Sequence, residues 1–198
     1  MTKNGFKPIG FSTRLIKAIQ QRGAGENIIK NLAELIKNCD DAYDTLQQKN
    51  IDTNGIIEVG YWQFLQKKRR VINAYFVRDY GIGMTIQQAH DAFGEKSYGE
   101  DTSANTRNGA IGVGGKDAFY DMEDVFIVSI HKGIPILIEL RTNKDSIIEY
   151  QITENTSDVK SAIYEINKKI SSYCNPIKLE QDGTFAMFKL PSHRTGLR

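Results

Sequence analysis

The sequence predicts an α+β fold, a two-layer sandwich in which helices cover one face of a mixed, mostly antiparallel sheet. Two observations lead to this class. Segments with helical periodicity gather early in the chain, whereas β-rich runs gather late and are separated by turn signals such as Lys132-Gly133 and Asp182-Gly183. A chain of 198 residues suits one core, so we expect a single domain over residues 1–198.

The composition is that of an ordinary globular protein, with 40% hydrophobic and 25% charged residues. A net charge of +2 gives no electrostatic footprint for nucleic acid, and the basic run at 67–70 is interpreted as a solvated hairpin tip. The cysteines and histidines have neither disulfide nor zinc-ligand spacing. Because no apolar run reaches the roughly 18 residues of a membrane span, we expect a cytoplasmic protein that does not contact a membrane.

The first half of the chain predicts two helices and a hairpin. A helix capped by Ser12 or Thr13 is expected to run to about residue 21, and a second helix over 26–49. The second is the clearer one, because its apolar residues recur at helical spacing and form one stripe: Ile28, Leu32, Leu35, Ile36 and Cys39. Two β-rich runs at 56–65 and 71–78 then predict an antiparallel hairpin.

A long polar connection divides the rest of the chain. Thr85 caps a predicted helix over 86–93, and residues 94–111 lack periodicity, which is typical of a functional lid. The elements expected after it are a helix over 115–122, strands at 125–131, 135–140 and 146–152, a helix over 157–170 and a strand at 184–190.

The stretch GAIGVGGKDAF, residues 109–119, places four glycines and a lysine before a predicted helix. It fails as a Walker A loop, because Ala110 and Asp117 stand where that motif needs Gly and Ser or Thr, and Asp117 also breaks the dinucleotide-binding pattern. The backbone N–H groups of a glycine turn at a helix start can still hold an anion, to which Lys116 adds positive charge. A tight turn with a helix cap is the alternative interpretation.

Three polar residues, Glu34, Asn38 and Asp41, recur at helical spacing within AELIKNCDDA and are expected on one helix face, roughly opposite the apolar stripe. The ordinary interpretation is a solvated face. The alternative is chemical, because the Asn38 amide oxygen can bind Mg²⁺ together with phosphate oxygens. Glu34, one turn away, can then orient or deprotonate a water aimed at the terminal phosphate.

The segment RDYGIGM, residues 78–84, follows a predicted strand with a carboxylate and two glycines. Asp79 can accept a hydrogen bond from an exocyclic amine, which adenine offers and guanine does not offer at that position. The competing interpretation is a plain Asp-x-Gly turn, which is common after any strand.

Four short motifs, ELIKNCDDA, DYGIGM, GVGGKDA and DGT, resemble in order and spacing the N, G1, G2 and G3 boxes of the GHKL ATPase superfamily. Its members include gyrase B, the ninety-kilodalton heat-shock chaperone, histidine kinases and MutL, with microrchidia-type ATPases as close cousins. The resemblance covers about residues 12–190 and implies a Bergerat-type, histidine kinase-like ATPase fold that uses ATP and Mg²⁺. One departure is Asp117, where many relatives carry Ser, because its carboxylate would repel phosphates if it turned inward.

The resemblance implies a role for each matching residue. Glu34 would be the catalytic general base, Asn38 the magnesium ligand and Asp79 the acceptor for the adenine amine, while Thr184 would reach the base through water. Residues 94–111 would form the lid over the phosphates. The nucleotide-binding set that the resemblance implies is Asn38, Asp41, Asp79, Gly81, Gly83, Met84, Lys96, Ser97, Gly112, Val113, Gly114, Gly115, Lys116 and Thr184.

The function implied by the resemblance is Mg-dependent ATP binding and hydrolysis, in which lid closure couples nucleotide state to a homodimer or to a downstream effector domain or protein. Relatives of the gyrase and MutL type bring a further catalytic lysine from a following domain, so we expect slow hydrolysis by this domain alone. One alternative is a histidine-kinase-type phosphotransferase, which is disfavoured because no histidine precedes His90. The other is an ATP-gated interaction module with little turnover.

Overall fold

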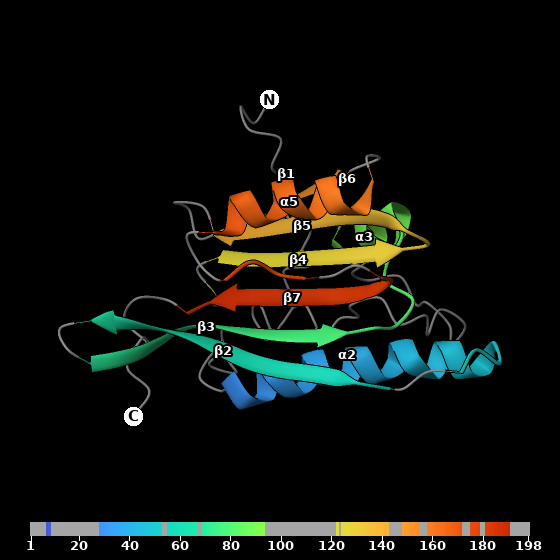
Figure 1. Ribbon diagram of the computed structural model, residues 1–198, viewed down its shortest axis with the longest axis horizontal. Coiled ribbons are helices and arrows are strands. Elements are labelled where there is room, and N and C mark those ends of the chain that lie inside the picture. Colours follow the sequence, from blue (N-terminus) through green and yellow to red (C-terminus); the bar gives the residue numbers. More distant parts are fainter. Residues whose placement is uncertain are drawn as a thin grey trace.

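The computed structural model describes residues 7–8, 28–52, 55–66, 69–93, 122, 124–142, 148–154, 158–171, 175–178 and 181–190. In this part of the chain, seven strands form one sheet and three helices pack on it (Figure 1). The predicted α+β class is confirmed, and every strand pairing among these residues is antiparallel. The predicted helix over 12–21 and the predicted lid lie outside the described residues, as does the predicted helix over 115–122 except for Met122.

The helices and strands have bounds close to those predicted, except β1 (Lys7–Pro8), which the sequence analysis did not predict. The helices are α2 (Ile28–Gln48), α3 (Ile86–Phe93) and α5 (Val159–Ile170). The strands are β1 (Lys7–Pro8), β2 (Ile57–Gln66), β3 (Arg69–Asp79), β4 (Asp124–His131), β5 (Ile134–Thr142), β6 (Ile148–Glu154) and β7 (Gly183–Lys189). Of the helices described here, none is both long and apolar enough to cross a membrane.

The last strand of the chain lies in the interior of the sheet. The strand order is β1-β6-β5-β4-β7-β3-β2, so β7 is inserted between β4 and β3 (Figure 1). Arg78 on β3 pairs with Phe185, and Ser129 on β4 pairs with Thr184. The start of β7 is therefore held between the end of β3 and the end of β4, which are far apart in the sequence.

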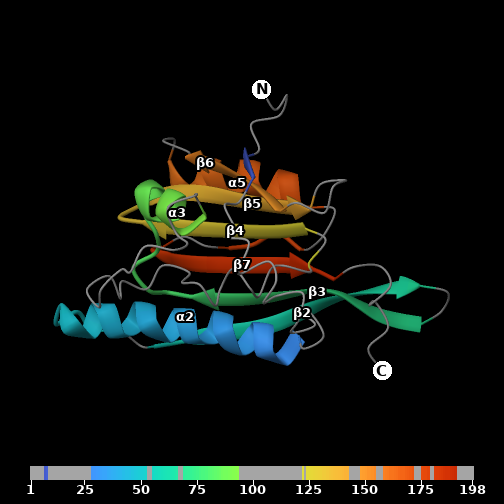
Figure 2. The same ribbon diagram turned by 180° about the vertical axis from the view of Figure 1, so that it is seen from behind.

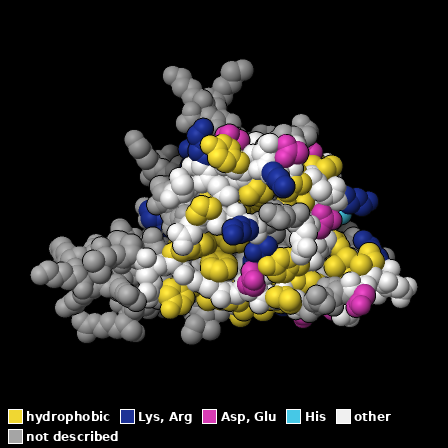
Figure 3. Space-filling view, in the orientation of Figure 1, with side chains coloured by type: hydrophobic (Ala, Val, Ile, Leu, Met, Phe, Trp, Pro, Cys, Tyr) yellow, Lys and Arg dark blue, Asp and Glu magenta, His cyan; other side chains and the backbone are white. Residues whose placement is uncertain are grey.

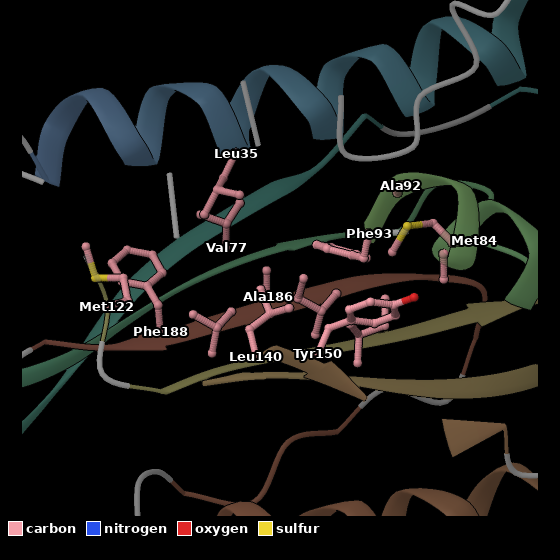
Figure 4. Packing of buried hydrophobic residues seen from close by; sticks show 14 of the residues in the cluster. Leu35, Val77, Met84, Ala92, Phe93, Met122, Leu140, Tyr150, Ala186 and Phe188 are labelled. Carbon is pink, nitrogen blue, oxygen red and sulfur yellow. The ribbon is translucent and has the colours of Figure 1, made fainter. Parts of the chain in front are cut away.

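One face of the sheet carries α2 and α3 (Figure 2). The predicted apolar stripe of α2 accounts for this contact, because Leu35 and Cys39 are buried in the cluster that also contains Val77 of β3 and Phe93 of α3. Figure 4 shows Leu35 and Val77 pointing toward one another from the helix and the sheet. This contact places the middle of α2 over the end of β3.

The opposite face carries α5, so the expectation that helices cover a single face is wrong for this helix. Ile166 and Ile170 of α5 are buried in a second cluster with Val128 and Phe185 of the sheet. The reason is visible in β4, where successive residues from Val125 to Ile130 are buried, so that both faces of this central strand need cover. A strand that is apolar on both sides is incompatible with one solvated sheet face.

The short helix α3 begins where the sequence predicts. Thr85 caps it, because its Oγ1 accepts from the Gln88 backbone N–H at 3.2 Å. The Gln88 side chain returns the contact by accepting from the Thr85 N–H at 2.8 Å, which completes a capping box. This cap fixes where the RDYGIGM segment ends and α3 starts.

Candidate functional site

Three sequence-distant segments meet at the end of β3: the middle of α2, the RDYGIGM segment and the start of β7. Between them lies a cavity of about 30 Å³. Its lining residues are Leu35, Asn38, Cys39, Ala42, Val77, Asp79, Gly83, Met84, Thr184 and Ala186. The structure therefore brings together predicted site residues from three of the four motifs.

The carboxylate of Asp79 is the most constrained polar group of this site, because the residue is only 3% exposed. Its Oδ1 accepts hydrogen bonds from the backbone N–H groups of Gly81, at 2.8 Å, and Thr184, at 3.2 Å. The Cys39 thiol of α2 also hydrogen-bonds to this carboxylate. The predicted turn after the strand is thus present, and the same carboxylate also lines the cavity.

Burial raises the pKa of Asp79 above its ordinary value, because a buried carboxylate loses the hydration that favours its charged form. The hydrogen bonds from Gly81, Cys39 and Thr184 act in the opposite direction, since they stabilise the charged form. Burial also raises the pKa of the Cys39 thiol, and the nearby charge of Asp79 adds to that effect. The thiol therefore remains a neutral donor toward the carboxylate.

Two glycines allow the backbones to approach closely around Asp79. Gly83 has a φ of +63°, and a Cβ added there would lie 1.9 Å from the Ile130 carbonyl oxygen. Gly183 has a φ of +141°, and its Cβ would lie 2.4 Å from the Asp79 carbonyl oxygen. Both positions thus combine a backbone conformation that favours glycine with a distance that excludes a side chain.

Ser129 is a polar residue of this region that the sequence analysis missed. Its side chain is fully buried in β4, and its Oγ accepts from the Met84 backbone N–H at 2.8 Å. The same Oγ lies 3.0 Å from Thr184 Oγ1 and 3.3 Å from the Gly183 carbonyl oxygen. A single serine within the apolar run DVFIVSIH was the available signal, because a buried hydroxyl needs hydrogen-bond partners.

Tyr43 is a second residue that the sequence analysis missed. Its hydroxyl donates to the Ile56 carbonyl and accepts from the Tyr80 backbone N–H at 2.8 Å. Burial raises the pKa of this phenol. The side chain thus ties α2 both to the segment before β2 and to the RDYGIGM segment.

A larger cavity of about 710 Å³ lies on the side of Tyr43 and Tyr80. Of the predicted site residues, Gly81 lines only the larger cavity, whereas Asn38, Asp79 and Thr184 line only the smaller one. Lysines and carboxylates are mixed around the larger space, so its lining does not favour a ligand of one charge. The predicted site residues therefore select the smaller cavity in spite of its size.

The three polar residues of α2 differ in exposure, and only Asn38 among them lines the cavity. Asn38 lines the cavity, and its amide nitrogen is buried without a hydrogen-bond partner among the described residues. The expectation that Asn38 lies opposite the apolar stripe is wrong. Asn38 shares a helix face with the buried residues Leu35 and Ala42, which are three and four positions away. Glu34 is partly exposed, whereas Asp41 is exposed and does not line the cavity.

The phosphate-binding half of the predicted site lies outside the described residues. It comprises Lys96, Ser97, Gly112, Val113, Gly114, Gly115 and Lys116. Within the described ranges, no three His, Cys, Asp or Glu side chains form a group that could hold a metal ion. A magnesium ion at Asn38 would thus take its other ligands from phosphate oxygens and water, which is how Mg²⁺ commonly binds.

The cavity fits an adenine nucleotide in chemistry and falls short of it in size. The lining of the cavity is mostly apolar and includes three polar groups. They are the Asn38 amide, the Asp79 carboxylate and the Thr184 hydroxyl. A volume of about 30 Å³ suits one water molecule rather than a purine. A base could therefore enter only if the space between α2 and the sheet widened.

Comparison with known proteins assigns no family to this chain. No protein-family model matches it, and no curated protein matches it. The chemistry of the site is therefore inferred from its residues and their geometry.

Replacing Gly83 by Ala should destabilise the protein far more than the same change at Gly133. Both residues have positive φ, +63° and +75°, but a Cβ at Gly133 meets nothing within 4 Å. We expect Gly133→Ala to cost about 1 kcal/mol of unfolding free energy and Gly83→Ala about 3 kcal/mol or more. Urea unfolding of the two variants measures the difference, and equal costs would show that the backbone contact at Ile130 is not tight.

Asp79→Asn should remove one pH-dependent contribution to stability. Because the pKa of Asp79 is raised on folding, this carboxyl stabilises the fold fully below its unfolded pKa. That contribution is lost as pH rises through its folded pKa. We therefore expect the unfolding free energy of the parent, relative to Asp79→Asn, to fall as the pH rises from about pH 3. Denaturant unfolding at a series of pH values tests this, and a difference that grew with pH would contradict it.

Proposed function

We propose that this chain binds an adenine nucleotide with Mg²⁺ and hydrolyses it slowly, as a domain of the GHKL type. The observation that carries the proposal is the convergence of Asn38, Asp79 and Thr184 on one cavity between α2 and the sheet. These residues come from three motifs of the resemblance, and they are separated by up to 146 positions in the sequence numbering. Their convergence supports the proposal because a chance match of short motifs does not require a shared cavity.

Asp79 would recognise the base. Its Oδ1 is occupied by the two backbone N–H groups, and a carboxylate still offers further lone pairs to a donor. An adenine amine is such a donor, whereas the oxygen of guanine at that position would face a negative charge. The adenine assignment thus depends on the charge and the acceptor-only character of this side chain.

Asn38 and Glu34 would act on the phosphate side. The Asn38 amide would offer its oxygen to magnesium, and the bound ion would neutralise phosphate charge. Glu34, one helical turn before Asn38, would accept a proton from a water molecule that attacks the terminal phosphorus. The new oxygen–phosphorus bond forms as the bridging bond breaks, which yields the diphosphate and inorganic phosphate.

The fold departs from the resemblance at α5, which covers the second sheet face. This helix lies across the sheet from α2 and does not line the cavity (Figures 1 and 2). On the face shown in Figure 3, Lys and Arg side chains are interspersed with Asp and Glu side chains. Coupling of the nucleotide state to a homodimer or to an effector is part of the proposal.

Isothermal titration calorimetry with ATP and GTP in the presence of Mg²⁺ tests the proposed base recognition. We expect ATP to bind at least about tenfold more tightly than GTP. In Asp79→Asn the amide oxygen would accept from the Gly81 and Thr184 N–H groups, and the amide nitrogen would present a donor to the base. This variant should therefore lose ATP affinity and the preference over GTP. Equal binding of both nucleotides by the parent, or no binding, would overturn the proposal.

Glu34→Ala should separate hydrolysis from binding. Without the proton acceptor, phosphate release should fall at least about 100-fold while calorimetric ATP affinity stays close to that of the parent. Asp44→Ala is the matched control, because Asp44 is an exposed carboxylate on the same helix and should keep the parent rate. Phosphate release by Glu34→Ala at the parent rate would show that this carboxylate is not the base.

A further inference from the structure

Ser129 stands out among the buried polar residues because it belongs to none of the motifs of the resemblance and yet contacts two of them. Its Oγ accepts from the Met84 N–H of the RDYGIGM segment and lies 3.0 Å from Thr184 Oγ1 of the DGT motif. The side chain is 0% exposed and lies in the central strand β4. A hydroxyl buried this deeply is costly unless it is hydrogen-bonded, which points to a specific task.

The proton of this hydroxyl has two available acceptors. Ser129 can donate to Thr184 Oγ1, in which case the Thr184 proton is free for another acceptor. Alternatively, Thr184 can donate to Ser129, and Ser129 then donates to the Gly183 carbonyl. The two arrangements differ in what Thr184 presents to the cavity, namely a donor in the first and only an acceptor in the second.

An acceptor placed beside Thr184 would select the first arrangement, because only this arrangement leaves the Thr184 proton available. The contact from Ser129 Oγ to Thr184 Oγ1 is 3.0 Å, whereas the contact to the Gly183 carbonyl is 3.3 Å. Hydrogen bonds between a hydroxyl and an oxygen are commonly about 2.5–3.0 Å, so the longer contact is the weaker one. The Ser129–Thr184 contact is thus kept in both arrangements, and the first one gives up only the weaker contact to Gly183.

Thr184 lies beside Asp79, because its backbone N–H donates to Asp79 Oδ1 at 3.2 Å. Both residues line the cavity, whereas Ser129 lies behind them and does not. In the first arrangement, the site thus presents an acceptor, Asp79, next to a donor, Thr184. Adenine carries the complement, an exocyclic amine beside an unprotonated ring nitrogen, and purines with an oxygen at that position reverse both groups.

We infer that Ser129 is a positioning residue for base recognition, and that it holds the Thr184 hydroxyl beside Asp79 with its proton available to the adenine ring nitrogen, directly or through one water. This inference rests on the proposed adenine-nucleotide binding. Ser129 itself touches no ligand. It acts by anchoring the Thr184 side chain and by polarising its hydroxyl through a chain of hydrogen bonds.

Two ATP analogues separate the contacts of Thr184 from those of Asp79. The triphosphate of 1-deazaadenosine keeps the amine and replaces the ring nitrogen by C–H, so it removes only the acceptor for Thr184. The triphosphate of purine riboside keeps the ring nitrogen and lacks the amine, so it removes only the donor to Asp79. For the parent protein, we expect each analogue to bind about tenfold more weakly than ATP in calorimetric titrations with Mg²⁺.

In Ser129→Ala, the preference for ATP over the 1-deaza analogue should fall to about threefold or less, while the preference over the purine riboside analogue is kept. Ser129→Cys, which has nearly the same volume and a weaker donor, should give an intermediate ratio and covers the case in which the alanine variant fails to fold. Thr184→Val should abolish the 1-deaza preference, and adding Ser129→Ala to it should change that ratio no further. Thr45→Ala is the matched control, because it removes a buried hydroxyl of α2 that does not line the cavity.

If Ser129 had a merely structural role, its replacement would weaken the binding of all three nucleotides by the same factor. The ratios of their affinities would then be unchanged. That outcome, or a parent protein that binds ATP and the 1-deaza analogue equally, would overturn the inference while leaving the proposed function in place. A parent protein that binds neither ATP nor the analogues would overturn the proposed function itself. Unchanged ratios in Thr45→Ala are required for the comparison to hold.

Discussion

The buried carboxylate of Asp79 is the interaction on which the rest of the site depends. A charge that is removed from water needs donors, and Asp79 obtains them from the backbone of its own turn, at Gly81, and from the start of β7, at Thr184. These hydrogen bonds join the end of β3 to a strand that lies far along the chain. The close approach of Gly183 to the Asp79 backbone belongs to the same constraint, because any side chain there would push β7 away.

The position of β7 gives that carboxylate its surroundings. Because the strand lies between β3 and β4, Thr184 lies between Asp79 on one side and Ser129 on the other. Helices on both faces bury this central part of the sheet, so its polar groups must pair with one another rather than with water. The helix α2 completes the site from above the sheet, held by Leu35 in the core and by the Tyr43 hydroxyl at its neighbouring loops.

The tight packing of the site opposes ligand binding. The cavity beside Asp79 is the size of a water molecule, so any base must separate α2 from the sheet and lose part of the packing around Met84 and Leu35. The intrinsic contacts to a nucleotide would be reduced by that cost. The amide nitrogen of Asn38 has no partner among the described residues, which works in the other direction. A ligand acceptor that pairs with this nitrogen removes an existing free-energy penalty.

The sequence alone predicted the described elements other than β1, because helical periodicity, turn residues and the Thr85 cap are local signals. It also predicted Asp79 and Thr184 as partners, but only through the resemblance of four motifs. What it could not determine was which elements lie side by side. The face of α2 that meets the sheet, the second layer made by α5, and the hydrogen bonds of Ser129 and Tyr43 depend on contacts between residues far apart in the chain. Such contacts have no local signature, so only the tertiary structure decided them. Because β7 lies between β3 and β4, a serine in an apolar strand becomes a neighbour of the site.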